Sequence, residues 1–83
     1  MNKATLNPVS NKFSSEDIYI KEKTKLLFNY SSNGLAAIVV IKFKRTGELI
    51  GETFTSSGEM DITGFEIIRF ESIEDCSIEY ELI

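Results

Sequence analysis

The stretch Cys-Ser-Ile-Glu-Tyr-Glu-Leu, residues 76–82, decides the fold class, because apolar and polar side chains alternate along it without a break. A period of two residues is typical of a β-strand that buries one face and leaves the other in water. The polar positions are Ser77, Glu79 and Glu81, which makes the exposed face acidic. We therefore predict a half-buried strand near the C-terminal end of the chain.

Further runs toward the N-terminus also have the character of short strands. They are residues 18–21, 24–30, 35–44, 48–55, 60–63 and 65–71. Between them lie Asn33-Gly34 and residues 45–48 and 56–59, which have the composition of tight turns. No sustained helical period competes with this pattern. About seven short strands with regular turn signals predict an all-β fold, a small antiparallel β-sandwich that is jelly-roll-like.

Residues 35–44 form the most apolar run, and both of its faces begin apolar. We predict that Val39 and Ile41 point into the core. Ile38 and Val40 then lie on the opposite face, which becomes rich in lysine further along and must be covered by the other sheet, by another segment or by a neighbouring subunit. The complete predicted core is Leu26, Phe28, Val39, Ile41, Phe43, Phe54, Ile62, Ile68, Phe70, Ile78 and Tyr80.

Residues 1–15 have no sustained period, and Asn, Ser and Lys dominate them. We predict a flexible N-terminal arm over residues 1–15 and one β-sandwich domain over residues 16–83. The arm holds three isolated apolar residues, so we expect it to order only by docking on an open sheet edge or on an apolar patch, in its own subunit or in a neighbour. The candidate interface residues are Leu6, Val9, Phe13, Ile38 and Val40. A homo-oligomer would add stability to so small a domain.

Composition excludes several chemistries. The chain has 83 residues, no His, no Trp and a single cysteine, Cys76. A His-based general base and a disulfide within the chain are therefore impossible, and a cysteine-rich zinc site is excluded. The alternation of residues 76–82 places Cys76 in the core rather than in a nucleophilic site. We expect no cofactor, no metal and no enzymatic activity.

Two acidic clusters could in principle serve acid–base chemistry or bind calcium. One comprises Glu71, Glu74 and Asp75, and the other comprises Glu59 and Asp61. Neither has the spacing of a calcium-binding loop, and a chain of this size rarely forms a cleft deep enough for sugar hydrolysis. We interpret both clusters as solvated turns.

Charge is divided unevenly along the chain. Residues 1–45 contain eight basic and three acidic side chains, whereas residues 46–83 contain one basic and ten acidic side chains. The favoured explanation is that strands from the two halves pair, with lysine opposite glutamate across a sheet. The alternative is a molecule with one basic and one acidic surface that stacks on copies of itself.

Three segments share a pattern with a known group of modules: residues 33–39 (Asn-Gly-Leu-Ala-Ala-Ile-Val), residues 56–59 (Ser-Ser-Gly-Glu), and residues 60–70, which contain the Gly64-Phe65 pair. Through these segments residues 24–83 resemble small β-sandwich modules of bacteriophage head and tail proteins. It implies a structural role in a virion or tail and self-association. It implies no set of catalytic residues.

We therefore expect a non-enzymatic structural protein whose partners are copies of itself or other virion proteins. The first alternative is a carbohydrate- or host-surface-binding module, for which Tyr19 is the best exposed aromatic candidate in a chain without Trp. The second is an OB-like single-strand binder, since residues 21–30 and 42–45 combine lysines with aromatic side chains. On paired strands these fall on opposite faces, and the net charge is −4, so we expect no nucleic-acid partner.

We also expect no membrane partner and a location in the virion or the cytoplasm. Residues 1–15 carry no apolar core of a signal peptide. The longest uncharged apolar run, residues 35–41, is far shorter than the roughly 20 residues that span a bilayer.

Overall fold

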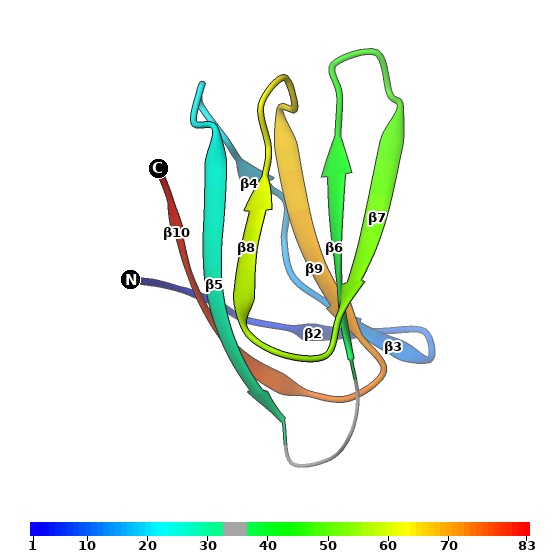
Figure 1. Ribbon diagram of the computed structural model, residues 1–83. Helices are drawn as coiled ribbons and strands as arrows, with labels where there is room; N and C mark the ends of the chain where they lie inside the picture. The colour runs from blue at the N-terminus through cyan, green and yellow to red at the C-terminus, as the bar shows by residue number, and fades with distance from the viewer. Residues whose placement is uncertain (33–36) are drawn as a thin grey trace.

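The computed structural model describes residues 1–32 and 37–83, which form ten β-strands (Figure 1). The strands are β1 (Asn2–Ala4), β2 (Asn7–Val9), β3 (Lys12–Ser14), β4 (Ile18–Tyr19), β5 (Lys25–Ser32), β6 (Ile38–Phe43), β7 (Leu49–Phe54), β8 (Gly58–Asp61), β9 (Ile67–Ser72) and β10 (Cys76–Leu82). Within these residues no helix is long and apolar enough to cross a membrane. The predicted Asn33-Gly34 turn lies outside the described residues.

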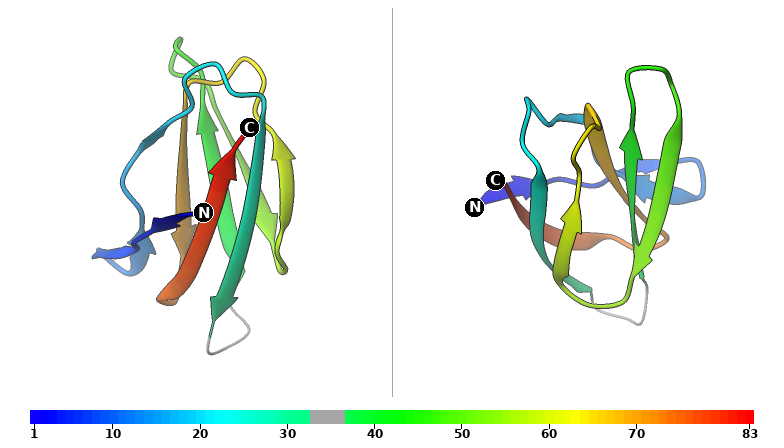
Figure 2. Two further views of the ribbon diagram at one scale, coloured as in Figure 1. Left: turned by 90° about the vertical axis from the view of Figure 1, so that its left-hand side faces the viewer. Right: turned by 45° about the horizontal axis from the view of Figure 1, so that its top comes forward.

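The strands form two antiparallel sheets that face each other, which confirms the predicted β-sandwich. The four-stranded sheet has the order β1-β10-β5-β8. The six-stranded sheet has the order β2-β3-β9-β6-β7, and β4 also pairs with β9. Figure 2, left, looks onto the four-stranded sheet, with β9 and β6 behind it.

The order of the strands is that of a jelly roll. The chain pairs as one long folded ribbon: β1 with β10, β3 and β4 with β9, β5 with β8, and β6 with β7. This ribbon is rolled so that β10 also meets β5 and β9 also meets β6. Each pair therefore joins one strand from the first half of the chain with one from the second half.

This nested pairing explains the uneven charge along the chain. Lys12 lies 3.0 Å from Glu71, Arg45 lies 3.2 Å from Glu66, and Lys42, Lys44 and Lys25 lie within 4 Å of Glu52, Glu48 and Glu59. Five of the seven ion pairs among the described residues join a base of residues 1–45 to an acid of residues 46–83, and Arg69 makes the other two. The structure thus confirms cross-strand pairing of the two halves.

The core lies between the sheets and is built around aromatic rings. The Phe28 ring meets the Phe54 and Phe70 rings edge-on, with ring centres 4.8 Å and 6.3 Å apart. The ring centres of Phe70 and Tyr80 are 5.8 Å apart. The first two contacts are edge-to-face and the third is tilted, and such aromatic pairs add to the free energy gained from burying apolar area. Buried apolar residues are Ala4, Leu6, Ile20, Leu26, Phe28, Ile38, Val40, Met60, Ile62, Ile68, Phe70, Cys76 and Ile78.

The predicted facing of β6 is wrong. Ile38 and Val40 are fully buried, whereas Val39, Ile41 and Phe43 lie on the outer face and are only partly covered. The prediction failed because both faces of this strand are apolar, so the alternation does not say which one is inward. Phe54 and Tyr80 are half-buried and pack against the core, in agreement with their predicted place.

Residues 1–15, predicted as a flexible arm, instead form three strands and belong to both sheets. Strand β1 pairs with β10, while β2 and β3 extend the six-stranded sheet. Ala4 and Leu6 are buried in the core. The expectation that this segment docks on an open sheet edge is met within its own chain, and these three strands account for the difference between about seven and ten.

A bulge separates β3 from β4 along the edge of β9. Ser14 is opposite Glu71, and Ile18 is opposite Ile68, so the N-terminal segment holds one more residue than its partner. Ser15 fills the gap: its N–H donates to the Phe70 carbonyl at 2.9 Å, and its hydroxyl accepts from the Phe70 N–H at 2.9 Å. Because of this extra residue the alternation of buried and exposed side chains is interrupted, so the sequence pattern does not predict these strands.

Candidate assembly interface

The outward side of the six-stranded sheet carries an apolar surface. Because Ile38 and Val40 point into the core, the residues that alternate with them face outward. Val39 lies opposite Glu71 and Thr53, Ile41 opposite Arg69 and Gly51, and Phe43 opposite Ile67 and Leu49. Tyr19 of β4 extends the last row next to Ile67. We name this surface the outer apolar face: Val39, Ile41, Phe43, Leu49, Ile67 and Tyr19.

Two of these side chains are strongly exposed. Leu49 is 56% exposed and Tyr19 is 62% exposed, while the other four are half-buried by their neighbours. Gly51 lies at the middle of the face, and a Cβ there would come within 3.5 Å of Val39 and 3.8 Å of Ile41. The missing side chain leaves Ile41 and Val39 open on that side.

The charged groups on this side of the sheet are paired with one another. Arg69 lies 3.2 Å from Glu71 and 3.4 Å from Asp17, and Lys12 lies 3.0 Å from Glu71. The Arg69 guanidinium also lies over the Phe43 ring, 5.0 Å from its centre. Two positive and two negative groups thus form one chain, and the outer apolar face carries no net charge.

The outer side of the four-stranded sheet has the opposite character. Glu59, Asp61, Glu79 and Glu81 face outward on β8 and β10, and the register sets Lys25 opposite Asp61 and Lys3 opposite Glu79. Hydrogen bonds from the Thr63 hydroxyl and the Thr63 N–H, at 2.6 and 3.0 Å, hold the pKa of the Asp61 carboxyl below its usual value of 3.8. This surface is therefore acidic at neutral pH.

The structure separates the predicted interface residues. Ile38, Val40 and Leu6 are buried in the core, so they are not available to a partner. Phe13 is partly buried against the core, and only Val9, 49% exposed, remains on the surface. The outer apolar face replaces this set. Three of its residues, Val39, Ile41 and Phe43, were predicted to point into the core, and Tyr19 was predicted to be exposed.

The remaining sequence candidates take structural places. Cys76 is buried, and its sulfur lies 3.5 Å from the Ser72 hydroxyl and 3.4 Å from the Glu74 carbonyl, so the thiol is a core group as predicted. Among residues 1–32 and 37–83, no three Cys, Asp or Glu side chains are placed to share a metal ion.

Several aromatic and basic side chains of the first half of the chain are held by contacts within the fold. Phe28 is buried, and the Tyr30 hydroxyl donates to the Phe54 carbonyl at 3.3 Å. Lys42, Lys44 and Arg45 each lie within 4 Å of a glutamate. These ion pairs use the positive charge that a phosphate backbone would need.

Comparison of the chain with protein-family models, with curated proteins and with solved structures finds no match.

Proposed function

We propose that this protein is a non-enzymatic assembly protein that self-associates through the outer apolar face. The observation that carries the proposal is the contrast between the two sides of the sandwich. One outer side is apolar with internally paired charges, and the other is acidic. Contiguous exposed apolar surface on a small protein is typical of an interaction site.

A face-to-face dimer with a second copy is consistent with the apolar outer side of one sheet and with the acidic outer side of the other. A two-fold contact between two outer apolar faces buries Leu49 and Tyr19 and keeps the acidic sheets in water. Head-to-tail stacking would instead set this apolar face against Glu79 and Glu81 of the next copy. The acidic groups would then lose water without gaining a partner.

The area of the outer apolar face determines how strong a dimer we expect. Strand β6 has six residues, and with about 3.3 Å per residue and four strands about 4.8 Å apart the face has a projected area on the order of 400 Å². A standard interface buries about 800 Å² on each partner. We therefore expect a weak dimer that forms at high protein concentration, or one that is reinforced inside a larger assembly.

The particular assembly that we propose is a bacteriophage virion or tail. The resemblance of residues 24–83 to phage structural modules supports it, and jelly rolls are frequent among viral capsid domains. The same fold also serves lectins, so the fold by itself does not choose between these roles. The proposed location is accordingly the virion or the cytoplasm of the producing cell.

The test is the mass in solution, measured by size-exclusion chromatography with light scattering over a wide concentration range. The Leu49→Lys variant places a charge on the outer apolar face. The Ile83→Lys variant is its matched control, because Ile83 is 54% exposed at the C-terminal end of the chain. We expect dimer formation by the wild-type and Ile83→Lys proteins and its loss in Leu49→Lys. A monomer at all concentrations, or equal behaviour of the two variants, would contradict the proposal.

A further inference from the structure

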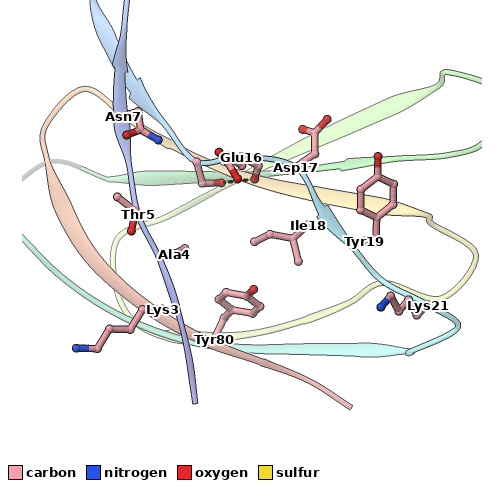
Figure 3. A pocket seen from close by; sticks show the side chains of 11 residues that line it. Lys3, Ala4, Thr5, Asn7, Glu16, Asp17, Ile18, Tyr19, Lys21 and Tyr80 are labelled. Carbon is pink, nitrogen blue, oxygen red and sulfur yellow. Dashed lines mark hydrogen bonds between the residues drawn. The ribbon is translucent and has the colours of Figure 1, made fainter.

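A groove opens at one side of the sandwich, between the edge strands β1 and β4 (Figure 3). Its volume is about 620 Å³, within the range of roughly 300–1,000 Å³ that is common for ligand sites. Residues of both sheets line it: Lys3, Ala4, Thr5, Asn7, Ser15, Glu16, Asp17, Ile18, Tyr19, Lys21 and Tyr80. Tyr19 is shared with the outer apolar face, and the other residues that line the groove lie outside that face.

The floor of the groove is apolar and is held in place by the core. Ala4 is buried, and the Ile18 and Tyr80 side chains extend toward each other from the two sheets (Figure 3). Tyr80 packs against Phe70, with ring centres 5.8 Å apart, so the position of its ring is fixed before any ligand arrives. A ligand with a flat apolar face can rest on these side chains.

The rim of the groove is polar and has no net charge. Lys3 and Lys21 carry positive charge, and Glu16 and Asp17 carry negative charge. Asp17 lies near Arg69, but within residues 1–32 and 37–83 the side chains of Lys3, Lys21 and Glu16 make no hydrogen bond or ion pair. Donors and acceptors therefore face the groove together.

These features disfavour three kinds of ligand. A nucleic acid needs an excess of positive charge, which this rim does not have. A metal ion needs clustered ligands, and the described part of the chain holds no such cluster. An added β-strand needs a long open edge, whereas β1 has three residues and β4 has two.

We propose that this groove binds a neutral oligosaccharide. Sugar hydroxyl groups both donate and accept hydrogen bonds, which suits a rim that carries both carboxylates and ammonium groups. The C–H face of a sugar ring suits a floor made of Tyr80 and Ile18. A linear saccharide follows a groove that is open to solvent along its length.

The test begins with the full chain and a defined panel of neutral saccharides. Maltotetraose, cellotetraose, mannotetraose and xylotetraose are titrated into the labelled protein and followed by amide chemical shifts, with a sialylated and a sulfated oligosaccharide as charged comparisons. We expect saturable shifts at Ala4, Ile18 and Tyr80 with at least one neutral saccharide. No saturable binding, tighter binding of the charged sugars, or shifts confined to other surfaces would overturn the proposal.

Variants then test the site itself. Glu16→Gln removes a rim carboxylate that is exposed to solvent, so folding is retained, and we expect the saccharide to bind about tenfold more weakly. Tyr80→Phe removes only the floor hydroxyl and keeps the packing on Phe70. The matched control is Glu79→Gln, the same change on the opposite face of β10, and it should leave affinity unchanged. Equal effects of Glu16→Gln and Glu79→Gln would place the binding elsewhere.

Discussion

Lys42 connects the two sheets. The sequence predicts it on the outward face of its strand, whereas the structure places it on the face toward the core. It lies on the core-facing side of β6, yet its ammonium extends to the open end between the two sheets, next to the last residue of β8. There it donates to the Asp61 carbonyl at 2.9 Å, and it lies 3.8 Å from Glu52 and 4.7 Å from the centre of the Phe65 ring. Its side chain is only 13% exposed. A lysine on the inner face is therefore tolerated because its stem packs and its charge finds partners.

We expect the Lys42→Met variant to lose about 1–2 kcal/mol of unfolding free energy, because a charged hydrogen bond between the sheets disappears while the stem is kept. Urea unfolding measures this loss. Lys44→Met is the matched control: Lys44 is 41% exposed, pairs with Glu48 at 3.7 Å and lies 5.4 Å from the centre of the Phe65 ring, so a change within about 0.5 kcal/mol is expected. Equal losses in the two variants would show that Lys42 is an ordinary surface lysine.

At the scale of the elements, the sequence predicts a strand well when only one of its faces is apolar. Strand β10 has polar residues on every outward position, two of them acidic, and its bounds and facing agree with the prediction. Strand β6 is apolar on both faces, so its existence was predicted correctly but its facing was predicted wrongly. Strands β1 to β3 have three residues each, too short for a period to emerge, and the Ser15 bulge breaks the pattern after them. For the same reasons three of the candidate interface residues, Leu6, Ile38 and Val40, were placed on the surface although the structure buries them.

We expect Leu6→Ala to cost about 2–4 kcal/mol of unfolding free energy, because Leu6 is only 6% exposed and its removal leaves a cavity in the core. Thermal and urea unfolding measure the loss. Val9→Ala, in the same segment but at a side chain that is 49% exposed, should change stability by less than about 0.5 kcal/mol. If Leu6→Ala were as mild as Val9→Ala, residues 1–15 would be an arm after all.

The whole molecule combines a nested pairing of its two halves with two unlike outer surfaces. Ion pairs between the first and second halves of the chain neutralise many charged side chains. The net charge of each subunit is −4, and acidic side chains gather on the outer side of the four-stranded sheet. A face-to-face dimer brings two such subunits together through a surface without net charge. Long-range repulsion between the subunits then opposes association, and the apolar contact favours it.

The dependence of self-association on salt distinguishes the two modes of assembly. Added sodium chloride screens the repulsion between like-charged subunits, so we expect the proposed dimer to become tighter as salt rises. Stacking of a basic surface on an acidic one would become weaker instead. Sedimentation equilibrium at low and high salt measures whether the dimer dissociation constant falls or rises with salt. Weaker association at high salt would contradict the face-to-face arrangement.

The most direct test of the central claim is a dilution series of the wild-type chain followed by amide chemical shifts. The outer apolar face leaves water only in the dimer, so we predict that concentration-dependent shifts cluster on β6, β7 and β9, at Val39, Ile41, Phe43, Leu49 and Ile67. The acidic positions Glu79 and Glu81 should not move. Shifts that cluster on β8 and β10, or a spectrum that does not change with concentration, would contradict self-association through this face.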